Sequence, residues 1–144
     1  MEKSTIALSA LLLVIILLFI SFFIIKDTKL HGDENVHYGQ ILQFSKGNYL
    51  INSALTTIPG YHILLASIAK ISSNSLPFIR LLNFFLSLIS IGIFFLLAKK
   101  ISPSSSALKS IQYTLFPILF PLFFLVYTDV LSLLLVMLAI LCAF

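Results

Sequence analysis

The sequence has little charge, a single cysteine and no tryptophan. Only 10% of its 144 residues are charged and 60% are hydrophobic, whereas about a quarter of the residues of a soluble domain are charged. A water-soluble fold of this size could not bury so much apolar surface, so the lipid bilayer is the expected solvent. The lone Cys142 excludes an internal disulfide, and the lack of a Cys/His cluster speaks against a structural metal. We expect no metal and no cofactor.

The positive charges are few and scattered. The formal charge of +4 comes from nine Lys/Arg against five Asp/Glu, and the cations lie at the ends of apolar runs and form no basic stripe. This pattern is typical of topology determinants and headgroup contacts, and it does not match a nucleic-acid-binding surface. The expected partners are therefore membrane lipids, with no nucleic acid.

Long apolar runs predict an all-α polytopic membrane protein. Residues 6–25 carry no charge, and as a helix they would cross about 30 Å of hydrocarbon. This run is longer than the apolar part of a cleaved signal peptide, which is about 7–15 residues, and we expect a retained span. Further spans are predicted at about residues 81–98, 111–126 and 130–144. This division places Asp129 in a turn and avoids a mid-membrane position that costs about 2.5–3.5 kcal/mol.

Residues 26–80 form one long loop between the first two predicted spans. The spacing of apolar residues predicts a short helix that begins at Asp33 or Glu34 and reaches Ser45. Residues 57–60 are typical of a helix start, with Thr as the cap and Pro in the first turn. The apolar run that follows is too short to span a bilayer, so we expect an interfacial helix there. Arg80, at the edge of the second span, is expected to reach the headgroups.

The charge distribution favours a cytosolic N-terminus. The short turn at residues 99–110 carries only basic charge, whereas loop 26–80 carries acids as well. Short basic loops determine orientation most strongly. Loop 26–80 and residues 127–129 then share the far side, so Asp129 faces the same compartment as Asp33 and Glu34.

The acidic cluster in this loop is the candidate site. Residues 31–37 read His-Gly-Asp-Glu-Asn-Val-His, and on a helix Asp33 and His37 are four residues apart and can converge. A carboxylate just outside a span could accept the proton of an attacking sugar hydroxyl. Asp33 and Glu34 would point about 100° apart on a helix, so they are not expected to act as an equivalent pair. The simpler interpretation is a solvated loop with a helix cap.

A set of motifs in fixed order resembles the dolichyl-phosphate-glucose α-1,2-glucosyltransferases, which add the terminal glucose to the N-glycan lipid precursor. The motifs are Asp33-Glu34-x-x-His37-x-x-Gln40, Gly47, Leu-Thr-Thr-Ile-Pro-Gly-Tyr at 55–61, Arg-Leu-Leu-Asn at 80–83, Ser-Ile-Gln at 110–112, Phe-Pro at 116–117 and Tyr-Thr-Asp at 127–129. The resemblance covers about residues 20–144. It departs at residues 49–54, where many relatives have a Trp-Asp-Pro-type segment. The family is much longer, so this chain is expected to be a single transmembrane unit from its N-terminal part, and the fragment alone is expected to be inactive.

The resemblance implies a GT-C-type glycosyltransferase in the endoplasmic reticulum membrane, with a lumenal first loop. It implies inverting transfer of glucose from dolichyl-phosphate-glucose to a lipid-linked oligosaccharide, through an α-1,2 linkage. Asp33 is the implied catalytic base, with Glu34 second. The candidate substrate-binding residues are His37, Gln40, Thr56, Thr57, His62 and Asp129.

Simpler interpretations and other functions stay open. The two threonines can be capping residues, a His on an apolar helix is most often a polar group with a local partner, and an acid between two spans is most often an interfacial turn residue. Another polyprenyl-phosphate-sugar transferase, for example for mannose, is an alternative function. A non-catalytic membrane subunit or channel-associated protein is another.

Overall fold

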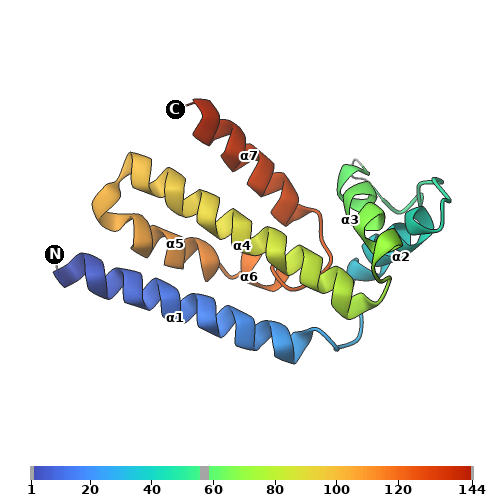
Figure 1. Cartoon of the computed structure of the whole chain (residues 1–144), viewed down its shortest axis with the longest axis horizontal. Helices are drawn as coiled ribbons and strands as arrows, with labels where there is room; N and C mark the ends of the chain where they lie inside the picture. The colour runs from blue at the N-terminus through green and yellow to red at the C-terminus, as the bar shows by residue number, and fades with distance from the viewer. Residues whose placement is uncertain (1, 56–58, 144) are drawn as a thin grey trace.

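The computed structural model describes residues 2–55 and 59–143, and within these residues the chain is helical without a strand (Figure 1). Thr56 and Thr57, which were predicted to cap a helix and to bind substrate, lie outside the described residues. The helices are α1 (Glu2–Ile25), α2 (Glu34–Ser45), α3 (Gly60–Ile71), α4 (Leu76–Ile101), η1 (Pro103–Ser105), α5 (Ser106–Thr114), α6 (Leu119–Leu122) and α7 (Asp129–Ala143).

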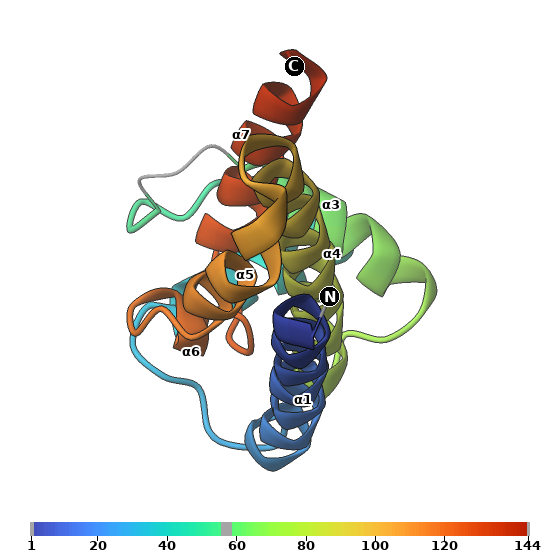
Figure 2. The ribbon, with the colours of Figure 1, turned by 90° about the vertical axis from the view of Figure 1, so that its left-hand side faces the viewer.

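Helix α4 is the centre of the bundle. It packs against α5 and α7, while α1 packs against α5. Seen from the end of the bundle, α1 lies on one side of α4 and α5, and α7 lies on the other (Figure 2). The pair α2 and α3 packs together at the end of the bundle where α4 begins (Figure 1). The predicted short helices of the long loop are therefore present, with bounds close to those expected.

Among the residues that the structure describes, two helices are long and apolar enough to cross a membrane, Thr5–Ile25 and Leu76–Ile101. The first agrees with the predicted span. The second extends beyond the predicted span at both ends. Pro77 lies in its first turn, where the missing N–H of proline costs no helical hydrogen bond. On α1, many large apolar side chains are exposed: Ile6, Leu8, Leu12, Leu13, Ile16, Leu17, Phe19, Ile20, Phe23 and Ile24.

The stretch predicted as a span at about residues 111–126 is not one continuous helix. Helix α5 ends at Thr114, before Pro117, and only the four-residue α6 follows. Proline has no N–H to donate and disfavours the helical conformation of the residue before it. Pro117 therefore prevents α5 from continuing, whereas Pro121 lies within the single turn of α6. The predicted break before the last helix is present at residues 123–128, but Asp129 is the first residue of α7 and not part of the turn.

A polar stripe runs along the buried side of α4. Arg80, Asn83, Ser87 and Ser90 are each 0% exposed, and their spacing places them on one face of the helix. Polar groups inside an apolar bundle must be hydrogen-bonded, because each unpaired group costs several kcal/mol. We therefore expect these four side chains to form hydrogen bonds with the elements that pack against α4.

This stripe holds the irregular segment that leads into α7. Asn83 Nδ2 donates to the carbonyl oxygens of Leu122 at 2.9 Å and Leu125 at 2.7 Å, and Ser87 Oγ donates to the Phe123 carbonyl at 3.1 Å. Since the helix is broken here, side chains of α4 supply hydrogen bonds to these carbonyls in place of helical N–H groups. The position of the N-terminus of α7 is thereby fixed relative to α4.

Candidate functional site

Glu34 and Arg80 form a fully buried ion pair between α2 and α4. Arg80 Nη2 donates to Glu34 Oε2 at 2.7 Å and Arg80 Nε donates to Oε1 at 2.8 Å, and both side chains are 0% exposed. This two-point geometry is the strong form of the Arg–carboxylate interaction. The expectation that Arg80 reaches the lipid headgroups is wrong, because its guanidinium turns inward to a buried carboxylate.

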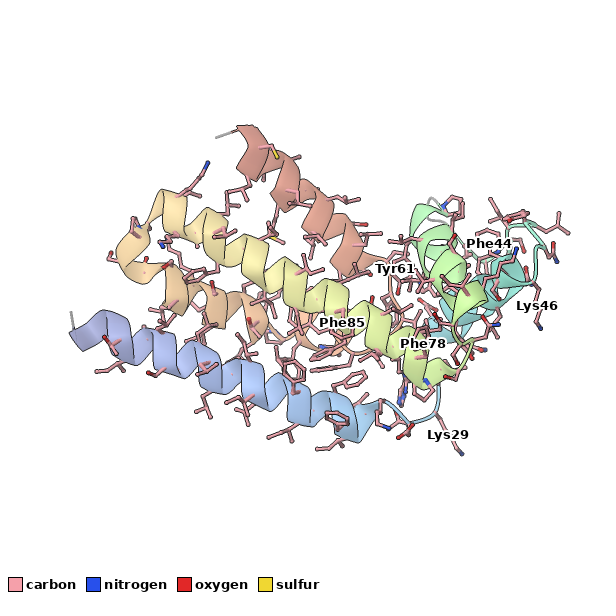
Figure 3. The ribbon with its side chains drawn as sticks, viewed as in Figure 1. Lys29, Phe44, Lys46, Tyr61, Phe78 and Phe85 are labelled. Carbon is pink, nitrogen blue, oxygen red and sulfur yellow. The ribbon has the colours of Figure 1, made fainter. Side chains whose placement is uncertain are left out.

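Arg80 also caps the C-terminal end of α1. Its Nη1 donates to the carbonyls of Ile25 at 2.9 Å and Thr28 at 2.9 Å, and its Nη2 donates to that of Lys29 at 3.1 Å. The last carbonyls of a helix lack intrahelical partners, and a cation is favourable at that end. Lys29 itself is exposed and extends away from the bundle (Figure 3), so the buried cation at this turn is Arg80.

The Glu34 carboxylate is fully occupied. In addition to Arg80, it accepts hydrogen bonds from the backbone N–H groups of His31 at 3.1 Å and Val126 at 3.0 Å. Burial raises the pKa of Glu34, but the hydrogen bonds from Arg80, Val126 and His31 outweigh it and hold this pKa below its usual value. The prediction of Glu34 as a second base is not supported, because a buried carboxylate with these partners cannot reach an acceptor hydroxyl.

Asp33, next to Glu34 in the chain, has the opposite surroundings. It is exposed, and although it is the N-cap residue of α2 its side chain makes no capping hydrogen bond. The turn before it depends on Gly32, whose φ of 53° is left-handed and whose missing Cβ would lie 3.5 Å from the Tyr127 hydroxyl. Glycine adopts this conformation at little cost.

Because Asp33 is exposed and its side chain makes no capping hydrogen bond, its carboxylate is free at the surface.

The start of α7 lies beside the start of α2. Tyr127 Oη donates to the His31 carbonyl at 3.3 Å, and the Val126 N–H binds Glu34. Asp129, the first residue of α7, is exposed. The buried ion pair thus holds two exposed carboxylates, Asp33 and Asp129, at one end of the bundle.

His37 and His62 form a second buried pair behind these acids. His37 Nδ1 lies 2.9 Å from His62 Nε2, and His62 is 0% exposed. Burial, followed by the nearby His37, lowers the pKa of His62 to about 4. Burial also lowers the pKa of His37, although the carboxylates of Asp129 and Asp33 oppose this. The expectation that His62 contacts a substrate directly is not met, because no part of it reaches the surface.

Gln40 holds the loop that follows α2. It is 0% exposed, its Nε2 donates to the Leu50 carbonyl at 3.0 Å, and its Oε1 accepts from the Asn52 N–H at 2.7 Å. Both ends of the amide are therefore used within the protein. The structure gives Gln40 a structural role and does not support direct substrate binding.

An apolar groove of about 490 Å³ reaches the acidic end of the bundle. Its walls come from α4, α5, α6 and α7, and its polar residues are Lys109, Gln112 and Asp129. The site therefore combines an exposed carboxylate pair with an adjoining apolar surface. That combination suits a substrate with a polar head and an aliphatic chain.

Sequence reasoning missed the buried polar stripe of α4. The signal was present in the spacing of Arg80, Asn83, Ser87 and Ser90 within an otherwise apolar helix. Polar residues inside a predicted span usually face the bundle interior and find partners there. This rule would have predicted an inward-facing Arg80 but not the identity of its partner.

Acidification is expected to destabilise the fold, because His62 is buried as the neutral form. Its pKa is about 4 in the folded chain against an ordinary 6.5, so the unfolded chain binds the proton more readily and stability falls as the pH drops through this interval. The depressed pKa of Glu34 adds a further loss at lower pH. The measurement is the unfolding temperature of detergent-purified protein between about pH 7 and about pH 4. His62→Gln should flatten the upper part of this profile, and an unchanged profile in that variant would contradict the assignment.

Comparison with known proteins gave one family. The family model described as the DIE2/ALG10 family matches residues 27–144. No curated protein and no solved structure matched the chain. The matched range contains both buried pairs and both exposed acids.

Proposed function

Because the chain belongs to the DIE2/ALG10 family, a family of glucosyltransferases in N-glycan precursor synthesis, we propose that it transfers glucose from dolichyl-phosphate-glucose to a lipid-linked oligosaccharide with an α-1,2 linkage. The observation that carries this proposal is the family match over residues 27–144. The structure supports it with the free carboxylate of Asp33, inside the matched range and next to a buried ion pair.

The proposed chemistry is a single in-line displacement. The acceptor hydroxyl attacks C1 of glucose, and Asp33 takes the hydroxyl proton as general base. The bond between C1 and the phosphate oxygen breaks, and its electron pair leaves with the lipid phosphate. A β-linked donor then gives an α-linked product, so the transfer inverts the configuration at C1.

Asp129 is proposed to bind hydroxyl groups of the sugar. An ionised carboxylate accepts hydrogen bonds only, and Asp129 is exposed at the start of α7 beside the start of α2. The buried pair of Glu34 and Arg80 positions both acids. Glu34 accepts a hydrogen bond from the Val126 N–H, three residues before Asp129, and it follows Asp33 directly in the chain. The separation of Asp33 and Asp129 is thereby set by buried, rigid parts of the fold.

The bundle is proposed to be a single GT-C-like transmembrane unit of the endoplasmic reticulum. The exposed apolar surface of α1 would be unfavourable in water and is suited to lipid. In this arrangement α1, α4, the α5–α6 stretch and α7 cross or enter the bilayer. The N-terminus is cytosolic, and α2 and α3 lie on the lumenal face, where the carrier lipid presents its sugar.

Cysteine labelling tests this orientation. After Cys142→Ser removes the natural thiol, single cysteines are placed at the exposed positions Asn48 and Ser104. In sealed microsomes a membrane-impermeant maleimide should label Ser104→Cys directly, and Asn48→Cys only after permeabilisation. Direct labelling of Asn48→Cys would contradict the lumenal placement of the site.

The activity itself is tested with the protein in its full natural length. We expect transfer of glucose from a dolichyl-phosphate-glucose donor to the glucosylated lipid-linked oligosaccharide, and none from the matching mannose donor. Transfer of mannose alone would indicate another sugar specificity. Correct membrane assembly without any sugar transfer would indicate a non-catalytic subunit.

A further inference from the structure

Two histidines from α2 and α3 meet behind the acidic site. His62 Nε2 lies 2.9 Å from His37 Nδ1, and the rings stack with centroids 5.2 Å apart and planes 18° apart. His62 is 0% exposed and His37 is 8% exposed. A side chain without exposed surface cannot touch a substrate, so His62 can act at the site only through His37.

The unpaired nitrogen of His62 indicates which ring nitrogens of His62 and His37 carry a proton. His62 Nδ1 is buried without a hydrogen-bond partner in the described part of the chain. If His37 donated to His62, a neutral His62 would carry its proton on Nδ1, as a buried N–H with no acceptor, and such orphaned donors are rare. The reverse arrangement leaves only a lone pair there. His62 Nε2–H therefore donates to His37 Nδ1, and the proton of neutral His37 lies on Nε2.

His37 Nε2 is left near the exposed acids without a hydrogen-bond partner among the described residues. If it were also buried, it would be a buried unpaired nitrogen, and among the described residues only His62 Nδ1 is one. His37 Nε2 therefore reaches the surface. The Tyr127 ring packs 5.4 Å from the His37 ring, and the carboxylates of Asp129 and Asp33 act on His37 electrostatically. The two carboxylates only accept hydrogen bonds, and the Tyr127 hydroxyl already donates to a backbone carbonyl. His37 therefore supplies a free donor at this place.

We propose that His62 is a positioning residue, which holds His37 with its Nε2–H directed at a phosphate oxygen of the lipid-phosphate sugar donor. This inference rests on the proposed function. As the bond between C1 and the phosphate oxygen breaks, the electron pair stays on the phosphate while the acceptor proton moves to Asp33. A neutral N–H donor stabilises the growing charge on the phosphate and takes no part in the proton transfer.

The proton positions are tested without reference to activity. Nitrogen NMR of the full-length protein in detergent micelles, with imidazole ¹⁵N labels, distinguishes protonated from unprotonated ring nitrogens. We expect His37 to be protonated on Nε2 and unprotonated on Nδ1 near pH 7, with the signals assigned by His37→Gln and His62→Gln. A protonated His37 Nδ1 would overturn the inference. This result holds whichever sugar the protein transfers.

The positioning role is tested by a double-mutant cycle on kcat/KM for the lipid-phosphate donor. His62→Leu should lower kcat/KM roughly 10- to 100-fold, the range for a hydrogen bond to a charged group. His62→Gln should recover most of it, because its amide N–H can replace Nε2–H. In a His37→Leu background, His62→Leu should cause no further loss, because His62 acts only through His37.

A structural role of His62 would give a different pattern. Equal losses from His62→Leu in both backgrounds would overturn the inference, and so would a kcat/KM within about twofold of the unmodified protein. Should leucine prevent folding, His62→Asn is the matched variant, since its shorter amide does not reach the Nε2 position. His62→Asn should then lose activity where His62→Gln keeps it, and equal activity of the two would overturn the inference.

Discussion

Asp33→Asn is expected to lower the rate of glucose transfer by about 10²–10⁴-fold, the usual contribution of a positioned general base. An amide has the shape of the carboxylate but cannot take the proton of the acceptor hydroxyl. Because Asp33 is exposed and makes no capping hydrogen bond through its side chain, stability should change by no more than about 0.5 kcal/mol. The measurement is the initial rate with both substrates saturating, with thermal unfolding followed in parallel.

The matched control is Asp27→Asn. Asp27 is also an exposed acid of the loop after α1, and its side chain pairs with Lys26. Its replacement should leave the transfer rate unchanged, since an exposed ion pair contributes little. A normal rate in Asp33→Asn, with normal expression and assembly, would exclude Asp33 as the base.

The contrast between Asp33 and Glu34 was only half predictable from the sequence. Adjacent residues of a helix diverge by about 100°, so their non-equivalence follows from local geometry alone. Which one is free depends on the position of Arg80, which lies far along the chain from Glu34. The resemblance placed Asp33 first, and the buried ion pair gives a physical reason for that order.

Local signals predicted the helices of the long loop. The expected helix from Asp33 or Glu34 to Ser45 is α2 (Glu34–Ser45), and the apolar run at 61–71 is α3 (Gly60–Ile71). Caps, turn residues and apolar spacing are short-range features, so one stretch of sequence contains them. Arg80 shows the limit, because its place at the edge of an apolar run is equally typical of a headgroup contact and of a cap for a distant helix end.

The broken helix after α5 shows a different limit. The predicted span over residues 111–126 contains Pro117 and Pro121, and prolines can be tolerated inside a span where neighbouring helices satisfy the freed backbone groups. The carbonyls that Asn83 and Ser87 bind belong to Leu122, Phe123 and Leu125, at and after the end of α6, and not to the residues four positions before the prolines. The helix ends before Pro117, because no neighbouring side chain can restore the N–H group that a proline lacks.

The second large effect is expected at the buried ion pair. Arg80→Met should destabilise the protein by about 3–5 kcal/mol, because it leaves the Glu34 carboxylate buried without a counter-ion. Arg80→Lys should recover only part of this loss. A single ammonium cannot reproduce the two-point contact with Glu34 together with the bonds to the carbonyls of Ile25, Thr28 and Lys29. The measurement is denaturant or thermal unfolding in detergent, with Lys70→Met as the control for loss of an exposed cation.

A double variant separates the ion pair from simple packing. Glu34→Gln alone should also be strongly destabilising, because it leaves a buried guanidinium without its carboxylate. Combined with Arg80→Met, it removes both charges, so the double variant should be clearly more stable than the sum of the two single losses predicts. Strictly additive losses would contradict a direct pair. Since the same pair binds the Val126 N–H and lies next to Asp33, each single variant should also lose transfer activity in the fraction that remains folded, because Asp33 and Asp129 are then no longer held in place.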